Sequence, residues 1–339
     1  MEQIPPTYRK LIATVHGKNY RNISRIVEVP LELPGAGELL VRNHYAGINA
    51  SDINLTSGAY GNLPSLPMDL GVEAVGEVVA IGEGVEGWQP GDAIAYLSPG
   101  AYGEYNRINA RVGYHLPRPS KEALPLVASA MTAAVGLNHV GDMGDTDLVL
   151  VTGAAGGTGQ FAVQLAKLAG NHVIALCGGE DKAAMLRSLG ADRVINYHHE
   201  SLDQILSQEY PKGVDLIYEC IGGEVFDICL EHIGFRGRLL IVGYISEYLG
   251  EPDSVLAPRV YTKLLWKSAS IRGFIASAYP RATRDETERL IKLWQNQQLI
   301  SKVDTTPFEG VEAIPDALDH LYGGRSLGKV IVNFPVIAN

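Results

Sequence analysis

Hydrophobic residues along the chain follow two different patterns, and the change between them falls near residue 125. Before it, segments such as 37–48 and 71–82 are short, rich in Val, Ile and Leu, and bounded by Gly and Pro. Branched apolar residues favour strands, whereas Gly and Pro clusters favour turns. The first part of the chain is therefore predicted to form a small, barrel-like β domain.

After residue 125, apolar segments alternate with helical patterns. The apolar segments are 147–153, 172–177, 193–197, 214–222 and 237–244. Near-continuous apolar runs are expected of parallel strands that are buried on both faces. The segments 159–170 and 180–191 have helical periodicity, so the second part is predicted to contain right-handed βαβ units in a doubly wound sheet, an α/β fold.

The C-terminal part returns to a mixed pattern. An amphipathic helix is expected over 285–299, a second helical pattern over 310–324 and a closing strand over 328–334. Because 339 residues exceed what one hydrophobic core usually organises, two domains are expected. We predict a β-rich catalytic domain of residues 1–125 and 280–339, and a nucleotide-binding domain of residues 126–279.

Charge and hydropathy exclude several kinds of partner. The net charge of -10 opposes binding to nucleic acid or to anionic membranes. The N-terminus lacks a basic segment followed by an apolar one, and no stretch approaches the roughly 18 apolar residues of a membrane span. The sequence therefore predicts a cytoplasmic protein that acts on small molecules.

The strongest local motif lies at 149–167, where a strand ending at Thr152 leads into a glycine-rich turn and a helix. Small residues let the backbone approach a pyrophosphate, and a helix N-terminus offers it free N–H groups. Ala155, Gly156 and Gly157 are the candidate contacts. The usual G-x-G-x-x-G motif begins with glycine, whereas Ala154 stands here. The strand before, the helix after and the strands that follow favour a dinucleotide site over a tight turn without a ligand.

The end of the second apolar strand distinguishes NADPH from NADH. An NAD site needs a carboxylate there, but residues 177–179 read Cys-Gly-Gly. The nearby Glu180 and Asp181 are better placed to stabilise the first turn of the next helix. Lys182 suits a 2′-phosphate, although it fits a surface helix lysine equally well, and Tyr197 offers a hydroxyl. The sequence therefore favours NADPH.

Several motifs together resemble one family, the medium-chain dehydrogenase/reductases, over essentially the whole chain. They lie at residues 47–52, 70–82, 90–96, 131–137, 153–167 and 328–332. Within this family the chain resembles the zinc-free quinone and enone reductases, and most of all the prostaglandin reductase (15-oxo-prostaglandin 13-reductase) group. The resemblance implies a GroES-like β-rich domain and a Rossmann nucleotide-binding domain.

The resemblance also bears on metal binding. Zinc-dependent members carry a cysteine where this chain has Asn49, and a histidine in a G-H-E triplet that here reads Gly-Val-Glu at 71–73. The cysteine-rich lobe that holds structural zinc is missing too, so we predict no metal site. The adjacent histidines 198–199 are expected on a solvated connection.

Carried over residue by residue, the resemblance implies a set of cofactor contacts. Thr158 would lie by the pyrophosphate, and Gly178, Lys182 and Tyr197 would surround the 2′-phosphate. Gly178 replaces the family's serine, which makes Lys182 more important or the preference for NADPH weaker. The other implied positions, in the cofactor groove and around the nicotinamide half, are Thr132, Cys220, Val242, Tyr248, Phe274, Ile275 and Ala276. Thr132 also fits a helix residue whose hydroxyl bonds its own preceding turn.

Without a metal ion, nothing would polarise an alkoxide strongly, so alcohol oxidation is disfavoured. Reduction of an enone does not require such polarisation by a metal ion. Hydride from NADPH adds to the β-carbon, and the negative charge appears on the carbonyl oxygen, where a hydrogen-bond donor must lie. The resemblance implies that Tyr279 contacts substrate and nicotinamide ribose, and that Asn49 and Tyr60 line the substrate cleft. Tyr279 and Asn49 are the candidate catalytic residues, whereas Asp52 and Glu73 are expected to be structural.

We therefore expect an NADPH-dependent reductase of α,β-unsaturated ketones or aldehydes, with the active site between the two domains. An NADPH:quinone oxidoreductase is the first alternative, because it uses the same hydride donor. A 2-enoyl thioester reductase and a non-enzymatic NADPH-binding protein are further alternatives. The resemblance also implies a homodimer joined along the sheet edge near residues 269–276.

Overall fold

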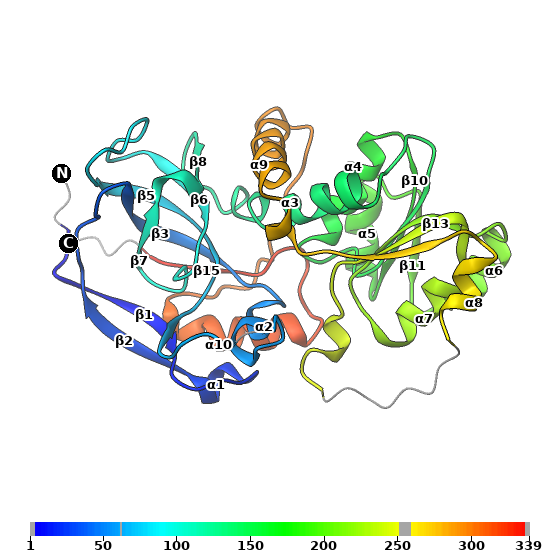
Figure 1. Cartoon of the computed structure of the whole chain (residues 1–339), viewed down its shortest axis with the longest axis horizontal. Coiled ribbons are helices and arrows are strands. Elements are labelled where there is room, and N and C mark those ends of the chain that lie inside the picture. The colour runs from blue at the N-terminus through cyan, green and yellow to red at the C-terminus, as the bar shows by residue number, and fades with distance from the viewer. Residues whose placement is uncertain (1–3, 62, 251–258, 336–339) are drawn as a thin grey trace. The chain divides into compact units, whose positions relative to one another are not determined.

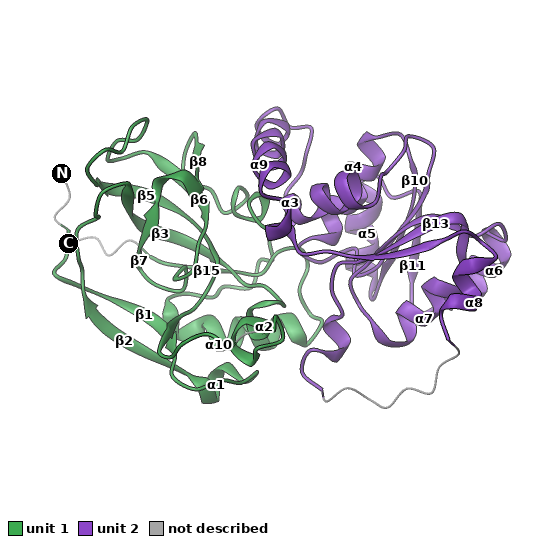
Figure 2. Ribbon diagram, in the orientation of Figure 1, with its two compact units in different colours: residues 1–128, 303–339 green, residues 129–302 purple. Residues whose placement is uncertain are grey.

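The computed structural model describes residues 4–61, 63–250 and 259–335, and the chain divides into two compact units. Figure 2 shows the first unit, residues 1–128 and 303–339, and the second, residues 129–302. The first boundary lies close to the predicted residue 125. The chain returns to the first unit only at Val303, not near residue 280 as the sequence suggested.

The later boundary has a physical reason in two buried glutamines of the second unit. The side chain of Gln164 donates to the carbonyl of Ile300 at 2.8 Å and accepts from its N–H group at 2.8 Å. Gln160 does the same with Lys302, at 2.9 and 2.7 Å. These paired bonds hold the segment after helix α9 (Pro280–Gln295) within the second unit.

The first unit is built mainly from antiparallel strands (Figure 1). Its smaller sheet has the order β2-β1-β4, with β1 at Thr7–Ala13, β2 at Ser24–Pro30 and β4 at Met68–Asp69. Its larger sheet has the order β15-β3-β5-β6-β8, and β7 also pairs with β3. These strands are β3 (Glu38–Gly47), β5 (Glu73–Ile81), β6 (Ala93–Leu97), β7 (Tyr105–Asn109), β8 (Gly113–Leu116) and β15 (Ile331–Asn333). The helices are α1 (Tyr20–Ile23), α2 (Asp52–Ser57) and α10 (Ile314–Tyr322).

The core of this unit lies against the larger sheet. Leu39 and Val41 of β3, Val78 of β5 and Ile94 of β6 are completely buried. Removing such side chains from water is the main stabilising contribution, about 25 cal/mol for each Å² of apolar surface. The predicted strands at 37–48 and 71–82 are therefore confirmed as central strands of the sheet, β3 and β5.

The second unit has one parallel sheet of order β11-β10-β9-β12-β13-β14. Its strands are β9 (Leu148–Val151), β10 (His172–Cys177), β11 (Arg193–Asn196), β12 (Val214–Glu219), β13 (Ile233–Ile241) and β14 (Ser270–Gly273). This is the 3-2-1-4-5-6 order of the doubly wound Rossmann fold, so the predicted fold class is confirmed. In such a sheet, ligands bind beyond the carboxyl ends of the strands where the order reverses, here between β9 and β12.

The helices of this unit alternate with the strands along the chain, and α3 precedes β9. They are α3 (Ser129–Ala134), α4 (Gly159–Leu168), α5 (Glu180–Ser188), α6 (Leu202–Glu209), α7 (Gly223–Glu231), α8 (Tyr261–Leu265) and α9. A π-helical segment, Val135–Val140, continues α3. Helix α9 begins earlier than the amphipathic pattern at 285–299 indicated, because Pro280 occupies its first turn, where a missing N–H group costs nothing.

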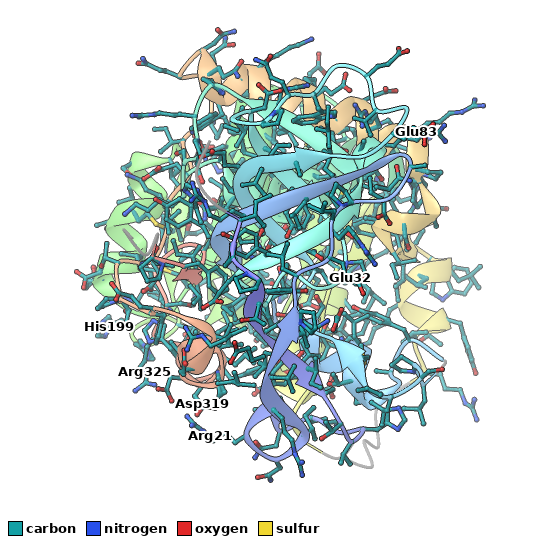
Figure 3. All side chains as sticks on the ribbon, turned by 90° about the vertical axis from the view of Figure 1, so that its left-hand side faces the viewer. Arg21, Glu32, Glu83, His199, Asp319 and Arg325 are labelled. Atoms are coloured by element: carbon teal, nitrogen blue, oxygen red, sulfur yellow. The ribbon has the colours of Figure 1, made fainter. Side chains whose placement is uncertain are left out.

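Charged side chains lie mainly on the outside of the molecule. Figure 3 shows the labelled side chains of Glu83, His199 and Arg325 reaching away from the ribbon. His198 and His199 are both exposed on the connection after β11, as the sequence predicted. Within the residues that the structure describes, no helix is both long and apolar enough to cross a membrane.

Candidate active site

The glycine-rich turn after β9 brings the backbone of strand and helix unusually close together. A β-carbon on Gly159 would lie 2.4 Å from the carbonyl oxygen of Gly153 and 2.7 Å from the α-carbon of Ala154, so no larger residue fits without a shift. Gly153 itself has φ +57. The backbone N–H groups of Gly157 and Thr158 have no hydrogen-bond acceptor within the described ranges. They lie at the start of α4, where an anion would find free donors.

The hydroxyl of Thr158 is engaged by other residues of the second unit. It donates to the carbonyl of Ser129 at 2.9 Å and lies 2.8 Å from the hydroxyl of Tyr218. Because its one hydrogen is engaged by Ser129, it accepts from Tyr218. The side chain thus ties the starts of α3 and α4 to β12. A pyrophosphate contact of Thr158 stays a prediction for its backbone N–H group.

A buried carboxylate holds the loop after β12, at the point where the strand order reverses. Glu219 accepts from the N–H groups of Ile221 at 2.7 Å and Gly222 at 3.1 Å, and from the hydroxyl of Thr152 at 3.1 Å. Thr152 in turn accepts from the N–H of Cys220 at 2.8 Å. Burial raises the pKa of Glu219, while these donors oppose the shift.

Glu219 therefore fixes the backbone beside the expected cofactor groove, and the sequence reasoning missed it. The signal was a carboxylate directly after the apolar residues 216–218, at the end of the strand Val214–Glu219. A parallel strand buried on both faces excludes an acidic residue unless its oxygens are satisfied locally.

The end of β10 forms the expected 2′-phosphate region. A β-carbon on Gly178 would meet the ring and hydroxyl of Tyr197 at 2.4 Å and Nε2 of His198 at 2.9 Å. The side chain of Asn196 accepts a hydrogen bond from the N–H of Gly179 at 3.0 Å and donates one to the carboxylate of Glu180 at 2.7 Å. Glu180 lies in the first turn of α5, where the sequence placed it. The structure thus gathers Gly178 and Tyr197, and Lys182 lies in the same first turn of α5.

The remaining groove positions lie at the ends of β12 and β13. Cys220 and Val242 are both half-buried, and the N–H of Val242 donates to the carbonyl of Glu219 at 2.9 Å. Burial and the nearby Glu219 raise the pKa of the Cys220 thiol well above its usual value, so it stays protonated at neutral pH. Tyr248 is 8% exposed and packs edge-to-face on Tyr244, which leaves little of its ring for a ligand.

The expected nicotinamide region follows β14. Phe274 packs so closely on the π-helical segment that a β-carbon on Gly136 would lie 2.9 Å from its ring. Tyr279 meets Phe274 edge-to-face with 6.5 Å between ring centroids, and its hydroxyl has no hydrogen-bond partner in the described part of the chain. Ile275 is 50% exposed and Ala276 is half-buried.

Thr132 of α3 is half-buried, and within the described ranges its hydroxyl makes no hydrogen bond to the preceding turn. The alternative interpretation, a hydroxyl engaged by its own helix, is therefore not what the structure shows. The hydroxyl remains available to a ligand.

In the first unit, Asn49 belongs to a buried polar cluster. Its Nδ2 donates to Oε1 of Glu73 at 2.9 Å, and its Oδ1 accepts from Nζ of Lys329 at 2.7 Å. Lys329 also pairs with Oε1 of Glu73 at 2.5 Å. Lys329 is 2% exposed and Glu73 is completely buried. The sequence reasoning missed Lys329, which lies only at the start of the motif at 328–332.

Asp52 anchors the loop that follows Asn49. Its Oδ2 accepts from the backbone N–H of Asn49 at 2.9 Å and from the hydroxyl of Tyr102. Burial raises the pKa of Asp52 to about 6, although both donors and the Lys329 ammonium oppose the shift. Asp52 and Glu73 thus have the contacts of structural residues. Tyr60, beyond α2, is 49% exposed.

Two families of known proteins match the chain. Residues 35–118 match the alcohol dehydrogenase GroES-like domain, and residues 157–296 match the family described as zinc-binding dehydrogenase. Mouse prostaglandin reductase-3 is 41% identical over 98% of this chain and 91% of its own length. A probable quinone oxidoreductase of Leishmania amazonensis is 40% identical over 97% of this chain and 98% of its own. The chain belongs to the medium-chain dehydrogenase/reductases.

A solved structure supports the same assignment and bears on the cofactor. Escherichia coli quinone oxidoreductase, complexed with NADPH, superposes with a TM-score of 0.81 at 25% identity, over 96% of this chain and 99% of that one. The medium-chain dehydrogenase/reductase described here is an NADPH-dependent oxidoreductase. Its residues fit NADPH, because the turn at Gly159 has room for no side chain and the end of β10 carries no carboxylate beside Gly178.

The residues do not fit the zinc ion that the name of one matching family implies. At the positions of the zinc ligands this medium-chain dehydrogenase/reductase has Asn49 and Val72, and the ammonium of Lys329 already binds both Asn49 and Glu73. A second cation beside these oxygens would be opposed by charge repulsion. Within the described ranges, no group of three or more His, Cys, Asp or Glu could hold a metal.

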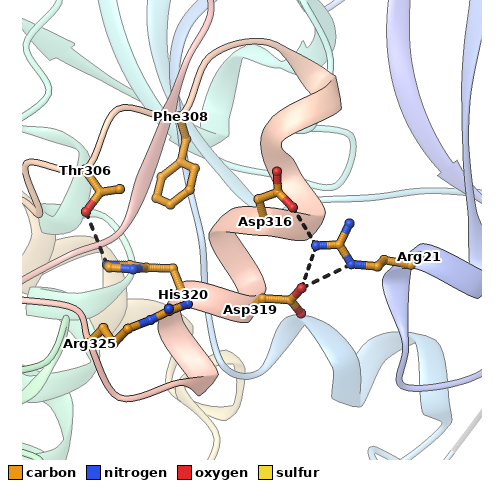
Figure 4. Close-up of a pocket in the computed structure, with 7 residues that line it drawn as sticks. All are labelled: Arg21, Thr306, Phe308, Asp316, Asp319, His320 and Arg325. Carbon is orange, nitrogen blue, oxygen red and sulfur yellow. Dashed lines mark hydrogen bonds and ion pairs between the residues drawn. The ribbon is translucent and has the colours of Figure 1, made fainter.

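A surface cavity in the first unit is lined by none of the predicted site residues (Figure 4). Arg21 bridges Asp316 and Asp319 at its rim, at 2.5 and 2.6 Å, and His320 faces Thr306. His320 also pairs with the buried Asp304 at 3.2 Å. These charges are satisfied by one another, so we assign the cavity no part in the chemistry.

Proposed function

We propose that this protein reduces the C=C bond of α,β-unsaturated ketones and aldehydes with NADPH and without a metal ion. The observation that carries the proposal is the ammonium of Lys329 on Asn49 and Glu73, because a cation already bound to these oxygens opposes the metal ion that would polarise an alcohol. The similarity to mouse prostaglandin reductase-3 points to the same class of reaction.

When bound, NADPH supplies the hydride that the β-carbon of the enone accepts. The protein must then stabilise the negative charge on the carbonyl oxygen. The hydroxyl of Tyr279 is suited to this, because a phenol can donate a hydrogen bond and no other described group occupies it. We assign Asn49 a second donor role through Nδ2, and Tyr60 a place in the wall around the substrate. The α-carbon then takes a proton from water.

Quinone reduction is the second candidate, and the similarity to the probable quinone oxidoreductase of Leishmania amazonensis supports it. Both reactions use the same hydride and the same stabilisation of a developing oxyanion. They differ in the acceptor alone, so the acceptor must be varied to distinguish them.

A panel of acceptors tests the proposal: an enone, an enal, a quinone and a 2-enoyl thioester, each at saturating NADPH. We expect kcat/KM to be highest for an enone or enal. A higher value for the quinone would favour the second candidate, and a higher value for the thioester would overturn both. Tight NADPH binding without turnover on any acceptor would instead identify a non-enzymatic NADPH-binding protein.

We also propose a homodimer in the cytoplasm. Strand β14 is the last strand of the parallel sheet, and an edge strand offers unpaired backbone groups to a second copy. Light scattering during size-exclusion chromatography should give twice the mass of one chain. A mass of one chain at micromolar concentration would contradict this.

A further inference from the structure

Sheet register brings three residues that lie far apart in the sequence to one place. Strands β15 and β3 are antiparallel with Ile331 opposite Gly47, and the N–H of Ile48 donates to Val330 at 3.0 Å. Continuing the same register places Lys329 opposite Asn49. Strands β3 and β5 pair with Ala46 opposite Ala74, which places Glu73 beside Gly47. The three polar residues therefore meet at one end of β3.

The chemistry of the partners fixes the orientation of the Asn49 carboxamide. An ammonium only donates hydrogen bonds and a carboxylate only accepts them. Lys329 therefore selects Oδ1, at 2.7 Å, and Glu73 selects Nδ2, at 2.9 Å. Rotating the amide by half a turn would place donor against donor and acceptor against acceptor. The second hydrogen of Nδ2 has only a long contact, 3.4 Å, with the carbonyl of Gly47.

Burial separates the three residues by role. Lys329 and Glu73 are withdrawn from solvent, whereas Asn49 is half-buried and covers them. A buried ion pair is often no more stabilising than apolar residues of similar size, so stability alone is a weak reason for its presence. The glycine at position 47 also leaves room for this ion pair, because a β-carbon there would lie 2.3 Å from Oε1 of Glu73.

We propose that Lys329 is a positioning residue for the reduction: with Glu73 it holds the Asn49 carboxamide so that the second Nδ2 hydrogen, which makes only the long contact with Gly47, is presented to the substrate. Lys329 acts through Asn49 and does not touch the substrate. This inference rests on the proposed function, in which Asn49 donates to the developing oxyanion.

The test is a double-mutant cycle on the hydride step, measured by stopped-flow at saturating NADPH and enone. We expect Asn49→Ala and Lys329→Met each to slow the step about ten-fold, since a misplaced donor loses much of its effect. The variant with both changes should be no slower than Asn49→Ala. Effects that multiply, or an unchanged rate in Lys329→Met, would overturn the proposal, because a merely structural lysine would not depend on Asn49.

Lys329→Met leaves Glu73 buried without its partner and is at risk of not folding. If so, Glu73→Gln/Lys329→Met removes both charges together, and the same comparison with and without Asn49→Ala gives the same expected and contradicting results. The wild-type protein separates this inference from the proposed function. If it reduces quinones but not enones, the proposed function fails, while the same cycle on quinone reduction still decides the role of Lys329.

Discussion

The hydroxyl of Tyr197 lies so close to the α-carbon of Gly178 that a β-carbon there would be 2.4 Å from it. The tyrosine hydroxyl therefore occupies the space that a side chain at position 178 would need, where the family resemblance implies a serine. We therefore expect the 2′-phosphate of NADPH to be bound by Tyr197 and Lys182.

Lys182→Ala should weaken NADPH binding about ten-fold or more and leave NADH binding within two-fold. A charge-assisted hydrogen bond contributes about 1.5 to 3 kcal/mol, and only NADPH has the phosphate that forms it. Tyr197→Phe should have a smaller effect of the same kind, because a neutral hydrogen bond is weaker. Fluorescence titration with both cofactors measures this.

Lys292→Ala is the matched control, because Lys292 is an exposed helix lysine on α9. It should change neither dissociation constant. If Lys182→Ala weakened the binding of NADPH and NADH equally, Lys182 would not bind the 2′-phosphate.

Tyr279→Phe should lower kcat on an enone about ten-fold or more, while the dissociation constant of NADPH stays within a few-fold. The ring keeps its contact with Phe274, so the change removes the hydroxyl alone. Losing one donor from an oxyanion site typically costs about 10² to 10³ in turnover, and a second donor reduces the loss. Stopped-flow measurement of the hydride step gives the answer directly.

Tyr261→Phe is the control for this change, since Tyr261 is 61% exposed on α8. Its hydride rate should equal that of the wild-type protein. An equal rate in Tyr279→Phe would leave the hydroxyl no part in stabilising the enolate.

Asp52→Asn should remove a pH dependence of stability between about pH 4 and pH 6. Burial raises the folded-state pKa of Asp52 to about 6, above the value near 3.9 in an unfolded chain. The folded state therefore binds the proton more tightly, and this contribution to stability is complete below about pH 4 and lost as the pH rises through 6.

Relative to the wild-type protein, the variant should become more stable from pH 4 to pH 7, by up to about 3 kcal/mol. Urea unfolding of both proteins at several pH values measures the difference. If the difference between the two proteins is the same at every pH, it reflects only the altered hydrogen bonds to Tyr102 and Asn49, and the raised pKa of Asp52 is contradicted.

Gly47→Ala should lower kcat on an enone several-fold although it removes no charge. The new β-carbon would lie 2.3 Å from Oε1 of Glu73 and push the carboxylate away from Asn49. Gly144→Ala is a suitable control, because a β-carbon there meets its nearest neighbour, Asp147, at an ordinary 3.6 Å. Full activity in Gly47→Ala would mean that the position of the Glu73 carboxylate does not affect the reduction.

The purified protein should contain no stoichiometric zinc, and a chelator should leave its activity unchanged. Lys329 already neutralises Glu73, and Asn49 and Val72 are not zinc ligands. Elemental analysis and a chelator-treated assay test this together. Zinc near one ion per chain, with activity lost on its removal, would show the assignment to be wrong.

The sequence predicted those parts of the fold that depend on continuous apolar segments. The runs at 172–177 and 193–197 became β10 and β11 because a parallel strand buried on both faces must be apolar throughout. The return at Val303 was missed because it depends on the side-chain amides of Gln160 and Gln164, which periodicity does not distinguish from surface glutamines.

The candidate site was predictable at the glycine turn and less so elsewhere. Nothing in the sequence joins Asn49 to Lys329, because only the register of β15 on β3 brings them together. Thr158 was expected by the pyrophosphate, and the bonds of its hydroxyl to Ser129 and Tyr218 were not predictable because they depend on packing of distant segments. The sequence also does not reveal that the ring of Tyr248 packs edge-to-face on Tyr244.

The most direct test of metal-free enone reduction is to identify the product by NMR after incubation with NADPH, an enone and a chelator. Tyr279 and Asn49 are assigned to the oxyanion, so the C=C bond should be the one reduced. We predict one saturated ketone formed for each NADPH oxidised, with its carbonyl intact. An allylic alcohol as the product, or no product once the chelator is present, would contradict the account.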